Sequence, residues 1–212
     1  MKLDDRAERQ QVPLRLFQTA FVILIGVLFL ALWYLVASSR NTPLDVYLRD
    51  PAATYAFTPL AGLISHIGVF AVSAAGVICI FASFHLSRGR SLLVLAGAFN
   101  LLIAMDDFFM LHEEILPRAL GVAESLVLLA YGAIAGVIFL IFRSSLTGRA
   151  HLGLCAAAAL LAASVLADNV MPYSMEQVIV EDGLKFLGLM VWSVYWTRRA
   201  HLALRGAARA SA

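Results

Sequence analysis

The sequence predicts an all-α, polytopic integral membrane protein, with six transmembrane helices in one bundle and both termini in the cytoplasm. Two observations of composition predict this class. Of the 212 residues, 61% are hydrophobic and 14% are charged, whereas soluble domains average roughly 25% charged residues. The mean hydropathy of +0.84 is too high for a water-soluble core of this size, because too little polar surface would remain to cover it. A secreted enzyme, a disordered tail and a nucleic-acid-binding module are therefore excluded.

Apolar runs supply the spans. A helix needs about 20 apolar residues to cross a hydrocarbon core roughly 30 Å thick, and most of the runs reach this length. Helices are required because lipid offers no hydrogen-bond partner to the backbone, and the alternating pattern of barrel strands is absent. The whole chain, 1–212, is expected to be a single membrane domain. The expected spans are approximately 17–37, 60–86, 91–112, 121–142, 150–168 and 176–197.

Local features support individual elements along the chain. The first apolar run is longer than the roughly 7–15 residues typical of a signal-peptide core, which favours an uncleaved anchor. The connection 38–59 carries apolar and aromatic residues and is expected to lie on the outer interface. In the fourth span, Gly132 and Gly136 form a GxxxG pattern, which predicts a contact face within the bundle, as do the alanine runs of the fifth span. Ser174 and Gln177 have the spacing of a capping box at the start of the sixth span.

The basic residues predict the orientation. If the N-terminus is cytoplasmic, twelve of the 16 Lys and Arg residues fall on the inner side. This excess predicts a plasma (inner) membrane protein with both termini on the cytoplasmic side. The twelve are Lys2, Arg6, Arg9, Arg15, Arg88, Arg90, Arg143, Arg149, Arg198, Arg199, Arg205 and Arg209.

The acidic residues show the opposite distribution. Eleven of the 14 lie outside or in the outer half of a span. Acidic residues contribute little to orientation, so topology does not explain this skew. The eleven are Asp45, Asp50, Asp106, Asp107, Glu113, Glu114, Glu124, Asp168, Glu176, Glu181 and Asp182.

Several of the acidic residues and two histidines are expected to lie at a similar depth in the membrane. At 1.5 Å per residue, Asp106 and Asp107 lie roughly 21–23 Å along the third span, and His66 lies roughly 9 Å below the outer entrance of the second. His112 and Glu113 follow one to two turns after the aspartates. A central Asp costs about 2.5–3.5 kcal/mol on insertion scales, so it is expected to face a polar interior with a partner. The sequence therefore predicts a functional cluster in the outer leaflet.

Helix periodicity assigns faces to the cluster. Steps of seven residues return to nearly the same face, so Asn100, Asp107 and Glu114 are expected to form one stripe. Asp106 and Glu113 are expected to form a second stripe beside it.

The sixth span contributes an acid–base group of its own. Lys185 follows Glu181 by four residues and Asp182 by three, which favours an ion pair with either carboxylate. Glu181 and Asp182 are expected to act as base or ligand, oriented by Lys185.

A metal-dependent hydrolase is the leading functional hypothesis. Carboxylates and imidazoles from separate helices suit a divalent metal such as Zn, Mn or Fe. A metal-bound water would then hydrolyse a lipid or a membrane peptide at the outer face. On an ideal helix, His112 is rotated about 140° from Asp107, so the two share an ion only if the helix ends near them. The candidate ligands are His66, Asp106, Asp107, His112 and Glu113.

Two alternatives stay open. Intramembrane Asp, Glu and His residues also mark ion- or proton-coupled transporters, although the inner halves of the spans have few polar residues to continue a path. The third hypothesis is an accessory or assembly subunit of a larger membrane complex, or an oligomer, that docks through Gly/Ala-rich helix faces. Membrane lipids are expected partners under each hypothesis, and nucleic acid under none.

Overall fold

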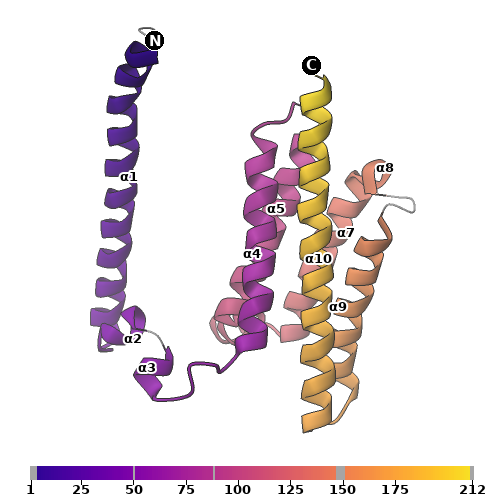
Figure 1. Cartoon of the computed structure of the whole chain (residues 1–212). Helices are drawn as coiled ribbons and strands as arrows, with labels where there is room; N and C mark the ends of the chain where they lie inside the picture. The colour runs from indigo at the N-terminus through magenta and orange to yellow at the C-terminus, as the bar shows by residue number, and fades with distance from the viewer. Residues whose placement is uncertain (1–3, 50, 88, 147–150, 211–212) are drawn as a thin grey trace. The chain divides into compact units, whose positions relative to one another are not determined.

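The computed structural model describes residues 4–49, 51–87, 89–146 and 151–210. The side chains of residues 4–16 lie outside this description, as do Lys2, Asp50, Arg88 and Arg149, which entered the charge distribution, and Ala150, where the fifth span was expected to begin. The described residues form helices and contain no strand (Figure 1). The prediction of an all-α chain is confirmed.

The chain separates into two compact units, residues 1–61 and 62–212. The first contains α1 (Asp4–Ser39) and two short helices, α2 (Asp45–Leu48) and α3 (Pro51–Tyr55), within the expected outer connection. Asn41 follows α1 with a φ of 53°, a left-handed conformation that Asn tolerates better than most residues. The ring of Trp33 then stacks on Tyr47, with centroids 5.1 Å apart, so aromatic packing holds α2 against the end of α1.

The second unit contains the remaining helices. Within it, α10 packs along both α9 and α4, and α4 packs along α5 (Figure 1). The helices are α4 (Leu63–Ser83), α5 (Arg90–Phe109), the π-helical turn η1 (Leu111–Ile115), α6 (Leu116–Leu120), α7 (Glu124–Ile141), α8 (Arg143–Leu146), α9 (Leu152–Val170) and α10 (Met175–Ala210).

Glycines set two of the helix contacts. A Cβ added at Gly97 of α5 would lie 2.6 Å from Ile80 of α4, and one added at Gly188 of α10 would lie 2.8 Å from Leu161 of α9. Only a residue without a side chain permits these approaches. The expectation that Gly132 and Gly136 form a contact face is wrong among the described residues, because an added Cβ at either meets no atom within 4 Å.

Five helices among the described residues are long and apolar enough to cross a membrane. The chain is thus an all-helical protein with five candidate spans. α10 is not one of the five, because Glu181, Asp182 and Lys185 on one side and Arg198 and Arg199 on the other interrupt its apolar segment. The candidate spans are Thr19–Ser39, Leu63–Ser83, Arg90–Phe109, Glu124–Ile141 and Leu152–Val170.

Candidate functional site

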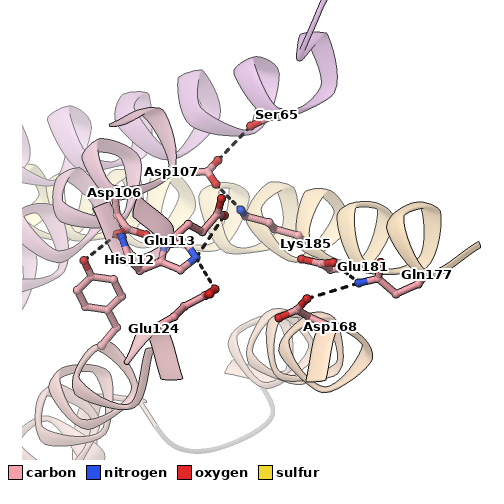
Figure 2. A network of polar contacts seen from close by, with 11 residues as sticks. Ser65, Asp106, Asp107, His112, Glu113, Glu124, Asp168, Gln177, Glu181 and Lys185 are labelled. Carbon is pink, nitrogen blue, oxygen red and sulfur yellow. Dashed lines mark hydrogen bonds and ion pairs between the residues drawn. The ribbon is translucent and has the colours of Figure 1, made fainter. Parts of the chain in front are cut away.

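A polar network lies in the second unit where α5 ends (Figure 2). It draws side chains from α4, α5, η1, α7, α9 and α10, and it consists of three groups. The first surrounds His112, the second is the ion pair of Asp107 with Lys185, and the third surrounds Gln177.

A break in the helix positions the first group. α5 ends at Phe109, Met110 adopts a left-handed φ of 54°, and the chain continues as the π-helical turn Leu111–Ile115. Such turns are uncommon and occur frequently at functional sites. The break carries His112 back toward the last turn of α5 and so overrides the angles of an ideal continuous helix.

Asp106 is the centre of the first group. Its carboxylate is buried and accepts hydrogen bonds from the His112 backbone N–H at 2.9 Å and the Tyr131 hydroxyl at 2.8 Å, both on Oδ1. The His112 Nδ1 lies 2.5 Å from the other oxygen, Oδ2. Three contacts therefore fix the carboxylate, and the carboxylate in turn fixes the imidazole ring.

The second ring nitrogen of His112 faces two further acids. Nε2 lies 3.4 Å from Oε1 of Glu113 and 3.8 Å from Oε1 of Glu124. His112 lies beyond the end of the α5 span, and its side chain is buried. Burial lowers the pKa of His112, but the hydrogen bond and charge of Asp106 and the charge of Glu113 raise it more, so the net pKa is above the usual value.

The second group joins α4, α5 and α10. Asp107 forms an ion pair with Lys185, and its other oxygen accepts a hydrogen bond from Ser65 at 3.4 Å. The side chain of Asp107 is 6% exposed and that of Lys185 is 28% exposed. Figure 2 shows Asp107 between Ser65 and Lys185. Lys185 was expected to pair with Glu181 or Asp182 on its own helix, and that expectation is wrong, since helix α5 presents Asp107 to it.

The third group lies at the start of α10. Gln177 Nε2 donates to Glu181 at 2.6 Å and to Asp168 of α9 at 3.5 Å. The Gln177 backbone N–H donates to the Ser174 hydroxyl at 3.2 Å, which is the Ser174 half of the predicted capping box, whereas the Gln177 side chain bonds to Glu181 and Asp168 instead. This bridge ties the end of α9 to the start of α10.

The expected site residues divide between these groups. Asp106, His112 and Glu113 come together as one group, while Asp107 belongs to the second group and Glu181 to the third.

Two expected residues and one expected stripe fall elsewhere. His66 is exposed with its ring near Phe108, at a centroid distance of 6.4 Å, and Asp182 is exposed on α10. Glu114 leaves the stripe of Asn100 and Asp107 and pairs with Arg118 at 2.5 Å, because the break at Met110 rotates everything that follows it.

The sequence interpretation missed Tyr131 and did not include Glu124 or Ser65 among the site residues. A signal for the first two was available: Glu124 and Tyr131 are seven residues apart and so share one face of α7. Both contact the group around His112. No comparable signal marks Ser65, whose only distinction is its position opposite Asp107.

The polar network contains more acidic than basic side chains. In the part of the chain that the structure describes, no group of three or more His, Cys, Asp or Glu side chains already stands in the arrangement of a metal site. The arrangement does provide an oriented imidazole whose free nitrogen faces carboxylates, together with a buried ion pair beside it. Chemically, such groups can bind a cation or exchange protons.

Comparison with known proteins places the chain in a family. No curated protein and no solved structure matches it. One family model matches residues 20–198, which include every residue of the polar network. The chain therefore belongs to the family described as "Domain of unknown function (DUF8692)".

Proposed function

We propose that the chain crosses a plasma (inner) membrane six times, with both termini in the cytoplasm. α10 is the sixth span: its 36 residues extend over about 54 Å, more than a bilayer core requires. Two of its polar residues in the outer half are partnered, Lys185 by Asp107 and Glu181 by Gln177. Partnered polar groups that face other helices are compatible with a span. The basic residues on the inner side support this orientation.

We further propose that the polar network is a metal centre built on His112. The observation that carries this proposal is the pair of distances from His112 Nε2 to Glu113 and Glu124, 3.4 and 3.8 Å. Two donor atoms that each lie about 2.1 Å from a tetrahedral Zn²⁺ are about 3.4 Å apart. The side chains of Glu113 and Glu124 are 40% and 43% exposed, so both have room to close around an ion.

Asp106 supports the proposal from the other side of the ring. Ligating histidines commonly donate their second ring N–H to a carboxylate, which fixes the tautomer and aims the free nitrogen at the metal. Asp106 holds His112 Nδ1 at 2.5 Å in this way.

The local charge also favours a cation. By formal charge, the four acids Asp106, Asp107, Glu113 and Glu124 face only Lys185 and His112, an excess of two negative charges even when His112 is protonated. A divalent cation would remove this excess of negative charge.

The reaction that this centre supports is hydrolysis of a lipid or a membrane peptide. A metal held there would supply a bound water of lowered pKa as the nucleophile, and a neighbouring carboxylate would take up the proton of that water. Glu124 would hold the metal together with His112, Glu113 is the carboxylate in reach of the proton, and Tyr131 is a hydroxyl donor near them.

Metal analysis of the purified protein tests this function. We expect about one Zn or Mn per chain in protein purified without chelator, and loss of that metal in Glu124→Gln. The matched control is Glu114→Gln, because Glu114 is the neighbouring acid and pairs with Arg118 instead of facing His112. A wild-type protein without stoichiometric metal, or a Glu124→Gln protein that keeps it, contradicts the proposal.

A proton-handling site of a transporter is the second candidate. The observation that favours it is the continuous series of proton-exchanging groups from Tyr131 through Asp106 and His112 to Glu113. In this case the purified protein contains no metal, and Glu124→Gln changes proton uptake by reconstituted vesicles instead of metal content.

A further inference from the structure

An apolar cavity of about 250 Å³ lies within the second unit, among α5, α7, α8, α9 and α10. This volume is close to the lower end of the range for small-molecule pockets, about 300–1,000 Å³. Its walls include Phe99, Gly136, Phe139, Leu146, Trp192 and Trp196. These residues are away from the polar network, so the cavity is a separate feature.

The cavity exists because α7 packs loosely. Of its residues, only Val127 and Ile138 are buried. A Cβ added at Gly136, in the cavity wall, would meet no atom within 4 Å. The surface is thus open to an occupant of the membrane itself.

The walls select an apolar occupant. The indole N–H of Trp192 donates to Asn100 Oδ1 at 3.0 Å, and the indole nitrogen of Trp196 is buried away from the surface. The cavity therefore offers hydrocarbon and aromatic surface and no accessible hydrogen-bonding group. A lipid acyl chain matches such a lining.

A basic residue stands at one edge of the cavity. Arg199 follows Trp196 by three residues and Trp192 by seven, so the three share one face of α10. Its guanidinium donates to the Ser145 carbonyl at 3.5 Å, directly beside the wall residue Leu146. Within the described ranges no carboxylate pairs with Arg199, so its charge is available to an anion.

His151, at the start of α9, does not compete for that anion. Burial and the charge of Arg199 lower the pKa of His151, and its Nδ1 lies 2.6 Å from the Tyr195 hydroxyl. His151 is therefore neutral at pH 7, and Arg199 carries the local positive charge.

We propose that this cavity is a binding site for one anionic phospholipid, with an acyl chain between α7 and α10 and the phosphate on Arg199. Basic pockets between transmembrane helices commonly bind anionic headgroups, and aromatic residues such as Trp192 and Trp196 are typical of the adjoining interface. The site is independent of the metal centre, so either can exist without the other.

Native mass spectrometry of the full chain in mild detergent tests the chain-binding part. The probes are palmitoyl-oleoyl phosphatidylglycerol and the phosphatidylcholine with the same chains. We expect one phosphatidylglycerol to bind wild-type protein at least tenfold more tightly than phosphatidylcholine. Gly136→Leu fills the cavity and should abolish this binding. Gly132→Leu is the matched control, because it adds the same group to equally open space on α7 outside the cavity wall.

A second pair of variants tests the headgroup contact. Arg199→Gln should remove the preference for phosphatidylglycerol, whereas Arg198→Gln removes the same charge from the next position and should leave the preference intact. Inorganic phosphate at millimolar concentration should not displace the lipid, since it has no chain to fill the cavity.

The proposal is overturned if Gly136→Leu binds phosphatidylglycerol as wild type does, if Gly132→Leu loses it equally, or if wild-type protein does not distinguish the two lipids. Metal content, measured on the same samples, should be unchanged in all four variants, so a failure here is separate from a failure of the metal centre.

Discussion

The Asp106 carboxylate contacts His112 at two points, the backbone N–H at 2.9 Å and the ring Nδ1 at 2.5 Å. The double contact fixes both the position of the residue and the orientation of its ring. It is possible only because the helix breaks at Met110, which lets a residue six positions later return to the same carboxylate.

Asp106→Asn should therefore weaken metal binding without removing a ligand. The amide keeps the shape of the carboxylate but loses its charge and one acceptor, and changes of this kind beside a metal ligand typically cost about 10–100-fold in affinity. Titration of chelator-treated protein with Zn²⁺ measures the effect. Glu114→Gln, on the π-helical turn that carries His112 but paired with Arg118, should bind like wild type. Equal affinities for Asp106→Asn and wild type would show that the contact does not orient a ligand.

The raised pKa of His112 predicts how the metal-free protein responds to pH. Because protonation is favoured in the folded state, it contributes stability that is fully present below the unfolded pKa of about 6.5 and is lost as pH rises through the higher folded-state pKa. We expect the thermal midpoint of chelator-treated protein to fall across that window, and the fall to be smaller in His112→Gln. A wild-type midpoint that rises there has the wrong sign for this interpretation.

Metal binding should show the opposite dependence on pH. Metal and proton compete for His112 Nε2, so the affinity for Zn²⁺ should increase as pH rises through the same window. The measurement is the same Zn²⁺ titration repeated at several pH values. An affinity independent of pH would exclude His112 as a ligand.

The ion pair of Asp107 with Lys185 should stabilise the packing of α5 against α10. Removing one partner of a buried pair costs about 3–5 kcal/mol, and the 28% exposure of Lys185 favours the lower end of that range. Lys185→Met should lower the free energy of unfolding in detergent by about 3 kcal/mol. The double variant Asp107→Asn/Lys185→Met should be more stable than Lys185→Met alone, because no uncompensated charge remains. If the two are equally stable, the pair is not coupled.

The helical class of the fold and the presence of Asp106 and Asp107 in a polar network were predictable because both follow from local quantities. Apolar runs mark the helices, and the cost of a carboxylate in lipid makes Asp106 and Asp107 conspicuous. Pairing between helices depends on their rotation and on which neighbour they meet. For that reason the spacing on α10 favoured Glu181 as the partner of Lys185, whereas the partner in the structure is Asp107.

The break after α5 was less predictable. The local sequence around Met110 does not require a left-handed backbone conformation, since neither Gly nor Pro occurs there. The π-helical turn follows from tertiary packing. The seven-residue step from Glu124 to Tyr131, in contrast, was visible in the sequence and would have added α7 to the site.

At the glycines, sequence pattern and packing disagree. A Cβ at Gly97 would lie 2.6 Å from a side-chain atom of Ile80 and 2.9 Å from the backbone oxygen of Gly76. Gly97→Ala should therefore force α4 and α5 apart and destabilise the protein by about 1–3 kcal/mol, the usual cost of overpacking. Gly132→Ala, within the GxxxG pattern, should change stability by less than about 0.5 kcal/mol, because its surroundings are open. Unfolding in a denaturing detergent measures both variants, and a larger loss for Gly132→Ala would mean that another helix covers α7 in the membrane.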